Sequence, residues 1–150
     1  MKNNPSIRLI SNEKAILFLK ENHARKENVF VRPSEKWGGF FFGDELVSVI
    51  GINRKKNHVS FSSSFTKQEY RWKGCGYVML LWALNQVPGE KVISYANPRF
   101  YLLEKILGYQ ELQTLKNGTK KTSFISKGGY DLWIYGNMEN CIENITWTEK

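Results

Sequence analysis

A segment with two glycines in the middle of the chain constrains the fold more than any other feature of the sequence. Residues 70–76 read Tyr-Arg-Trp-Lys-Gly-Cys-Gly and join an alternating apolar stretch at 59–65 to a helix-like stretch at 77–86. Glycines let a backbone approach a ligand closely, and the first N–H groups of a helix lack partners within the helix. A strand that passes through such a turn into a helix can bind a pyrophosphate, although the same pattern also serves as a plain structural turn.

The length and composition of the chain predict a single domain that spans residues 1–150. With 41% apolar and 14% aromatic residues the chain can build a hydrophobic core, and a second full domain does not fit in this length. No stretch is apolar for long enough to cross a bilayer, and the first five residues lack the apolar core of a signal peptide. We therefore expect a soluble, cytoplasmic protein with no membrane partner.

The charge of the chain favours a polyanionic ligand. There are 22 Lys and Arg residues against 14 Asp and Glu, which gives a formal net charge of +8. Such a balance suits a phosphorylated cofactor or a nucleic acid and does not separate the two. Cys75 and Cys141 lie far apart in the sequence and outside any metal-ligand motif, so we expect two free thiols and no metal site.

In the N-terminal half, hydrophobic spacing predicts a helix at 12–22, followed at 23–35 by a charged, irregular loop or short second helix. Residues 37–42 and 45–52 predict two strands joined by a two-residue turn that begins with Gly43. The strand at 59–65 should then alternate, with one face formed by Val59, Phe61, Ser63 and Phe65.

In the C-terminal half, a helix at 77–86 and a strand at 91–96 should form a crossover connection. The next helix, at 98–107, has a proline in its first turn and Gly108 as its terminator. Three strand-like stretches complete the chain, at 109–115, 119–126 and 130–135. This order predicts an α/β (α+β) fold with a mixed sheet and helices on its faces.

From Trp37 to Tyr109 the chain resembles the GCN5-related N-acetyltransferases (the GNAT superfamily). The turn Arg71-x-x-Gly74-x-Gly76 is similar to the acyl-CoA signature of that family, and a strand that ends at Asn97 follows it. Residues 103–109 read Leu-Glu-Lys-Ile-Leu-Gly-Tyr, similar to the family's Leu-Tyr-Glu-Lys-Leu-Gly-Phe. The resemblance implies a mostly antiparallel, twisted sheet with a central pair of parallel strands and helices on both faces.

The resemblance also implies acetyl-CoA, or another acyl-CoA, as the cofactor. The strands at 59–65 and 91–96 would splay apart, and their unpaired backbone groups would bind the amides of the pantetheine arm. Backbone N–H groups near Ser64 and Phe65 would bind the thioester oxygen. The residues implied to bind the cofactor are Ser64, Phe65, Arg71, Trp72, Lys73, Gly74, Cys75, Gly76 and Asn97.

The implied reaction is direct transfer of an acyl group from the thioester to an amine, which needs a base, a stabilised oxyanion and an acid for the leaving thiolate. The position that usually holds the acidic tyrosine is Glu104 here, while Tyr101 lies one helical turn earlier. Both are candidates for the acid, and neither need be catalytic. For the base we favour His23, and the alternatives are water, His58, Glu69 and Glu35.

Four short segments, at 18–23, 43–48, 93–96 and 134–137, resemble phage-encoded acetyltransferase-like proteins. That group is similar to the Mom proteins, which modify adenine in DNA. The acceptor could accordingly be a nucleobase in DNA or a protein lysine. The alternative is a noncatalytic, basic nucleic-acid-binding module on the same fold. The oligomeric state stays open, and a homodimer is compatible with the sequence.

Overall fold

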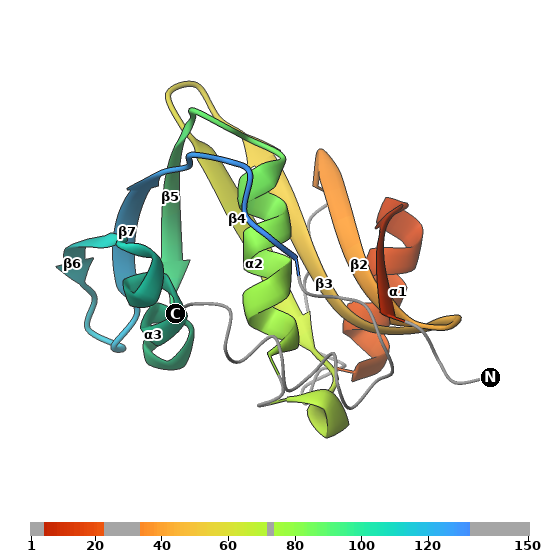
Figure 1. Ribbon diagram of the computed structural model, residues 1–150. Helices are drawn as coiled ribbons and strands as arrows, with labels where there is room; N and C mark the ends of the chain where they lie inside the picture. The colour runs from red at the N-terminus through yellow and green to blue at the C-terminus, as the bar shows by residue number, and fades with distance from the viewer. Residues whose placement is uncertain (1–4, 23–33, 72–73, 133–150) are drawn as a thin grey trace.

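The computed structural model describes residues 5–22, 34–71 and 74–132, which form one seven-stranded sheet with helices packed on it (Figure 1). The strand order is β1-β2-β3-β4-β5-β7-β6. In chain order the elements are β1 (Pro5–Ile10), α1 (Asn12–Asn22), β2 (Lys36–Phe42), β3 (Glu45–Arg54), β4 (Val59–Thr66), the 3-10 helix η2 (Gln68–Tyr70), α2 (Cys75–Asn85), β5 (Lys91–Ala96), α3 (Pro98–Leu107), β6 (Gln110–Thr114) and β7 (Lys120–Ile125).

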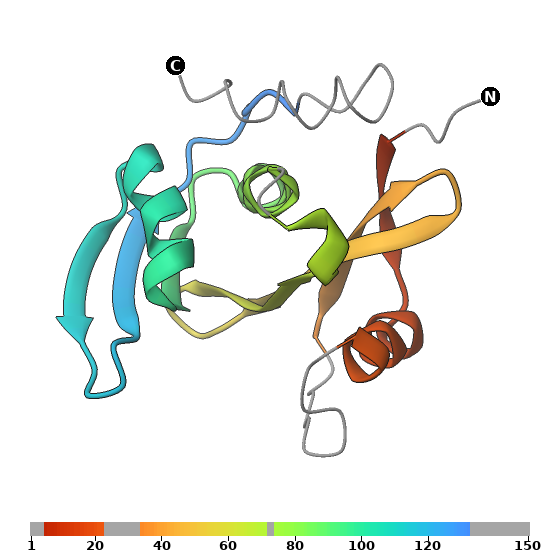
Figure 2. The same cartoon turned by 90° about the horizontal axis from the view of Figure 1, so that it is seen from below.

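The predicted fold class is confirmed. Every pairing in the sheet is antiparallel except that of β4 with β5, which is parallel. Viewed along the sheet, α2 lies on one face and α1 on the other (Figure 2). The hairpin of β2 and β3 turns at Gly43, whose φ is +61°, and Gly108 ends α3 with a φ of +103°, as the sequence predicts.

The predicted positions of the strands differ from the structure at both ends of the described chain. Strand β1 was not predicted, because it is a short edge strand that begins with a proline and leaves Leu9 63% exposed. The strand predicted at 130–135 is wrong over its described part, since residues 130–132 are irregular. Of the loop or short helix expected at 23–35, residues 23–33 lie outside the described residues.

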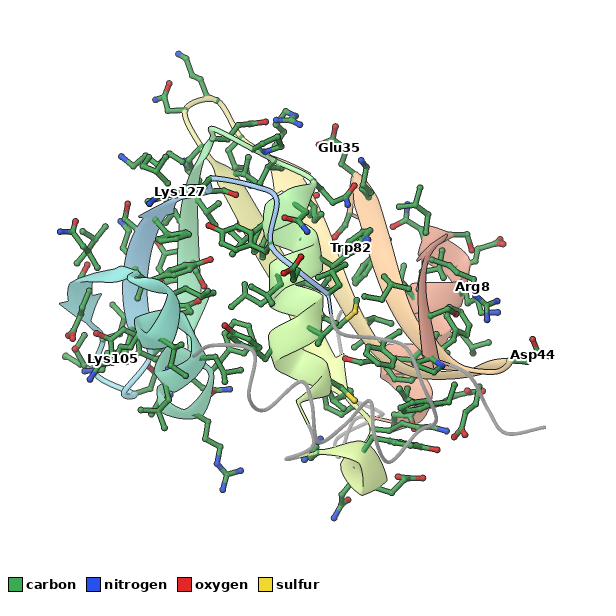
Figure 3. All side chains as sticks on the ribbon, viewed as in Figure 1. Arg8, Glu35, Asp44, Trp82, Lys105 and Lys127 are labelled. Atoms are coloured by element: carbon green, nitrogen blue, oxygen red, sulfur yellow. The ribbon has the colours of Figure 1, made fainter. Side chains whose placement is uncertain are left out.

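The sheet has a separate hydrophobic core on each face. The larger core lies beneath α2 and α3, and it requires a close approach of α2 to β2: a Cβ on Gly38 would lie 2.3 Å from the ring of Trp82 (Figure 3). The smaller core joins α1 to the opposite face, through Ala15, Phe18, Leu19, Trp37 and Val49.

The alternation predicted for β4 is broken by a register shift. Val49 pairs with Phe65 and Gly51 with Ser62, so β4 contains one residue more than β3 between these two pairs. Such a β-bulge moves the following side chain to the other face. As a result Phe61 packs in the larger core, beneath α2, whereas Phe65 packs in the smaller core, against α1 (the α1 core). The prediction that both lie on one face is wrong.

No helix among the described residues combines the length and the apolar character needed to cross a membrane.

We predict that Gly38→Ala destabilises the protein by about 1–3 kcal/mol, the usual cost of overpacking a core. The added methyl would be within 2.7 Å of three ring carbons of Trp82, so the indole or α2 must shift. Urea unfolding of Gly38→Ala, Trp82→Leu and the double variant measures this, and the cost of the methyl should shrink when the indole is absent. A Gly38→Ala variant as stable as the wild type would contradict the packing described here.

Candidate functional site

The parallel pair at the centre of the sheet is very short. β4 and β5 pair only through Val59 with Val92 and Ser60 with Ile93. Beyond these residues β4 continues beside β3 and β5 continues beside β7, and the two strands diverge toward the end of the sheet where α2 begins (Figure 1). Within the described part of the chain, each strand therefore has one edge of backbone N–H and C=O groups that no other strand pairs, as the resemblance implied for 59–65 and 91–96.

The two glycines of the turn before α2 differ in whether the backbone conformation requires a glycine. Gly74 is the N-cap of α2 and has a φ of +89°, a conformation that side chains with a Cβ rarely adopt. Gly76 lies in the first turn of the helix, and a Cβ there would meet no described atom within 4 Å. The chain geometry thus accounts for Gly74 but not for Gly76.

Arg71 is fixed at the end of β4. Its Nε donates to the carbonyl oxygen of Thr66 at 3.0 Å, and its guanidinium carbon lies 4.9 Å from the centre of the Phe65 ring. The side chain is exposed, and a guanidinium has further N–H donors besides Nε. Arg71 therefore presents a fixed positive charge beside the glycine turn.

The other residues predicted to bind a cofactor differ in their surroundings. Ser64 is exposed near the end of β4, next to the half-buried Phe65. The Cys75 side chain is buried, which fits selection for small size. Asn97 caps α3, because its Oδ1 accepts a hydrogen bond from the N–H of Phe100 at 2.8 Å. Trp72 and Lys73 lie outside the described residues, as does His23.

Glu104 is fully buried between α3 and the sheet. Its two carboxylate oxygens accept hydrogen bonds from the hydroxyls of Ser94 on β5 and Thr122 on β7, each at 2.7 Å. Loss of hydration on burial raises the pKa of the Glu104 carboxyl, and the two hydrogen bonds offset only part of this effect. In the sequence, only the polar Ser94 within an apolar strand could have indicated this contact.

Tyr101 points toward a different part of the sheet from Glu104. Its hydroxyl donates to Glu111 on β6 at 3.4 Å, and the amino groups of Lys105 and Lys120 lie within 6 Å of its ring centre, at 5.8 and 5.5 Å. Tyr101 thus faces the β6–β7 hairpin, whereas Glu104 is hydrogen-bonded to β5, the strand that borders the divergence. The structure separates the two predicted acids, and the role of each as an acid stays a prediction.

Of the alternative bases, one lies next to the turn. His58 directly precedes β4, at the opposite end of that strand from Arg71, and the Glu35 carboxylate accepts the backbone N–H of Arg54, at the same far end. Glu69 is exposed in η2, two residues before Arg71. The described residues hold no group of three potential metal ligands.

No family model and no curated protein matches the sequence. Solved structures of N-acetyltransferases are nevertheless similar to it. Naa50 of Arabidopsis thaliana, in complex with the bisubstrate analogue CoA-Ac-MVNAL, is 16% identical, with 79% of this chain and 98% of that chain covered and a TM-score of 0.60. The N-acetyltransferase YlbP of Bacillus subtilis, in complex with coenzyme A, is 11% identical, with 83% and 97% covered and a TM-score of 0.59.

A third similar structure, a candidate N-acetyltransferase of Lactobacillus plantarum, is 14% identical, with 83% and 99% covered and a TM-score of 0.67. At such low identity these similarities establish the fold. The fold of this chain is that of the GNAT superfamily, as the resemblance implied. The comparisons give no support to the narrower phage-encoded or Mom-like group.

We predict that Glu104 makes the stability of the protein fall as pH rises. Its folded-state pKa is raised above the unfolded value of about 4.3, so its contribution is complete below that pH and is lost as pH rises through the folded pKa. This fall in unfolding free energy is at most about 1.4 kcal/mol per pH unit, the limit for one proton. It should be absent in Glu104→Gln. Parallel curves of unfolding free energy against pH for the two proteins would contradict a buried, proton-holding Glu104.

Proposed function

We propose that the chain is an acyl-CoA-dependent N-acyltransferase that transfers an acetyl-type group directly to an amine of a macromolecule, either a nucleobase or a protein lysine. One observation carries the proposal: the strands β4 and β5 diverge toward the same end of the sheet at which the glycine turn leads into α2. The similar structures of Naa50 and YlbP, which contain a CoA-based analogue and coenzyme A, support it.

The described residues fit an acyl-CoA. The edge of β4 near Ser64 and Phe65 offers backbone groups to the pantetheine amides, and the N–H groups at the start of α2 offer a site for the pyrophosphate. Arg71 adds positive charge beside that site, and Asn97 lies where β5 leads into α3. When bound, the cofactor supplies a thioester whose acyl group is activated for transfer.

Gly76 supplies an independent argument for a ligand at the turn. A glycine within a helix lowers stability by about 0.5–1 kcal/mol relative to alanine, and a Cβ at this position would meet no described atom within 4 Å. Packing within the described part of the chain thus offers no reason to avoid a side chain. Close approach of a pyrophosphate to the backbone would account for the glycine.

The bulge in β4 suits stabilisation of an oxyanion. An extra residue between Ser62 and Phe65 disrupts the ladder with β3, and such a residue leaves its backbone groups unpaired. The backbone N–H of Ser64, at the bulge, would then donate to the thioester oxygen as negative charge develops on it. The transfer needs no covalent intermediate, and His23 remains our proposed base.

For the acid, the hydrogen bonds favour Glu104 over Tyr101. Glu104 accepts a hydrogen bond from Ser94, on the strand that borders the divergence, and burial raises its pKa, which favours the protonated form that an acid needs. We propose that the Ser94 hydroxyl gives its own proton to the leaving thiolate and takes the carboxyl proton of Glu104 in exchange. Tyr101 instead donates to Glu111 on β6 and would have to leave that partner to act.

We predict that Arg71→Ala weakens the binding of coenzyme A by about tenfold or more, because hydrogen bonds to charged groups contribute about 1.5–3 kcal/mol. Arg8→Ala is a matched control: Arg8 is also exposed, donates to a backbone carbonyl and lies over a phenylalanine ring, but on the edge strand β1 (Figure 3). Isothermal titration calorimetry compares the two. No binding to the wild type at millimolar coenzyme A would end the proposal, and equal losses in both variants would contradict the assigned site.

We predict that Glu104→Gln lowers kcat by about 100-fold with the affinity for coenzyme A retained, and that Tyr101→Phe changes kcat by less than about twofold. Release of CoA thiol from acetyl-CoA, with single-stranded DNA or a lysine peptide as acceptor, measures both. Because the acid must be protonated, wild-type kcat should fall as pH rises through the folded pKa of Glu104, and Glu104→Gln should lack this fall. A loss in Tyr101→Phe alone would assign the acid to Tyr101.

A further inference from the structure

The side chains of β5 and β7 that point away from α3 form a separate surface of the sheet. Ser94 and Thr122 point to Glu104 under α3, so the neighbouring residues Tyr95 and Lys121 project from the other side, where α1 lies. These two residues are paired across the strands, and the Lys121 amino group lies 5.8 Å from the centre of the Tyr95 ring. We call this surface the Tyr95 face; its members from β4, β5 and β7 are Ser60, Ser62, Lys91, Ile93, Tyr95, Lys121, Ser123 and Ile125, of which Ile93 is only 8% exposed.

The Tyr95 face is accessible. The α1 core lies over β2 and β3 and reaches β4 only at Phe65, and Figure 2 shows α1 at the β1–β2 end of the sheet. On β5 and β7 the side chains of Tyr95 and Ile125 are 60% and 56% exposed. A flat aromatic ring is thus presented to solvent from a rigid strand that is paired along its whole length with β7.

The charges of the three strands are all of one sign. β4, β5 and β7 contain Lys91, Lys120 and Lys121 and no Asp or Glu. Lys91 and Lys121 lie on the Tyr95 face, whereas Lys120 pairs with Glu111 on the other face. Carboxylates would be the natural partners of a cationic acceptor such as a protein lysine, and these strands offer none. Lysines beside an exposed aromatic ring suit a nucleic acid strand, with phosphates near the lysines and a base on the ring.

The position of Tyr95 links this face to the proposed site. Tyr95 belongs to the part of β5 beyond Ile93, where β4 no longer pairs with it. An acceptor that approaches from this side therefore meets Tyr95 at the border of the divergence.

We propose that the Tyr95 face binds a single-stranded nucleic acid, with a base stacked on Tyr95, and that an exocyclic amine of this base is the acceptor of the acyl group. The acceptor role rests on the proposed function. In the step the amine nitrogen forms a bond to the acyl carbon and the bond from that carbon to sulfur breaks. The amine loses a proton to a base, and the thiolate gains one.

The test is the fluorescence anisotropy of a labelled 12-nucleotide single strand of mixed sequence. Tyr95→Ala should weaken binding by about five- to a hundredfold, the range for loss of one base stack, and Tyr95→Phe should bind like the wild type. Lys121→Ala should lower the slope of log affinity against log salt by about 0.7. Leu102→Ala, at a residue of α3 that is 60% exposed, is the matched control and should bind like the wild type.

The proposal would be overturned by no binding of the strand to the wild type, by equal binding to Tyr95→Ala, or by tighter binding of polyglutamate than of the strand. Sedimentation of the wild type and Tyr95→Ala would show whether a second copy covers the face instead, which would also overturn it. Calorimetry with coenzyme A separates the two levels. If coenzyme A binds but Tyr95→Ala binds the strand as tightly as the wild type does, only this inference fails. If coenzyme A does not bind, the proposed function fails, whether or not the single strand binds.

Discussion

The divergence of β4 from β5 is the constraint on which the rest of the structure depends. Two buried polar contacts hold the strands on either side of it. On one side the Ser48 hydroxyl lies 2.8 Å from that of Thr66 and donates to the carbonyl of Phe65, which keeps the end of β4 on β3. On the other side Glu104 joins Ser94 to Thr122 and so keeps β5 with β7 and α3. Because each strand is bound to its outer neighbour, the inner edges stay available to a ligand.

The features that local chemistry determines were predictable from the sequence. The turn at Gly43, the proline that starts α3, and its end at Gly108 each follow from residues within a few positions of one another. The cofactor turn belongs to the same class, although its glycines looked equivalent in the sequence. Only the structure separates Gly74, which has a positive φ, from Gly76, which has open space around it.

The features that depend on distant parts of the chain were not predictable. The bulge in β4 arises from pairing with β3, and the alternating serines of β4 gave no local sign of it. The burial of Glu104 depends on the rotation of α3 about its axis and on two strands that meet only in the folded sheet. Both features lie at the candidate site, where backbone irregularity and a buried carboxyl group are retained at a cost in stability.

The most direct test of the central claim, that the turn at the start of α2 binds an acyl-CoA, is the paired measurement of stability and coenzyme A affinity in Gly76→Ala. A Cβ at this position meets no described atom within 4 Å, and alanine favours a helix over glycine. The free energy of unfolding should therefore equal that of the wild type or exceed it by up to about 1 kcal/mol. Affinity for coenzyme A should nevertheless fall, by about tenfold or more, because the methyl group meets the pyrophosphate. A stable variant that binds coenzyme A as tightly as the wild type would contradict the account.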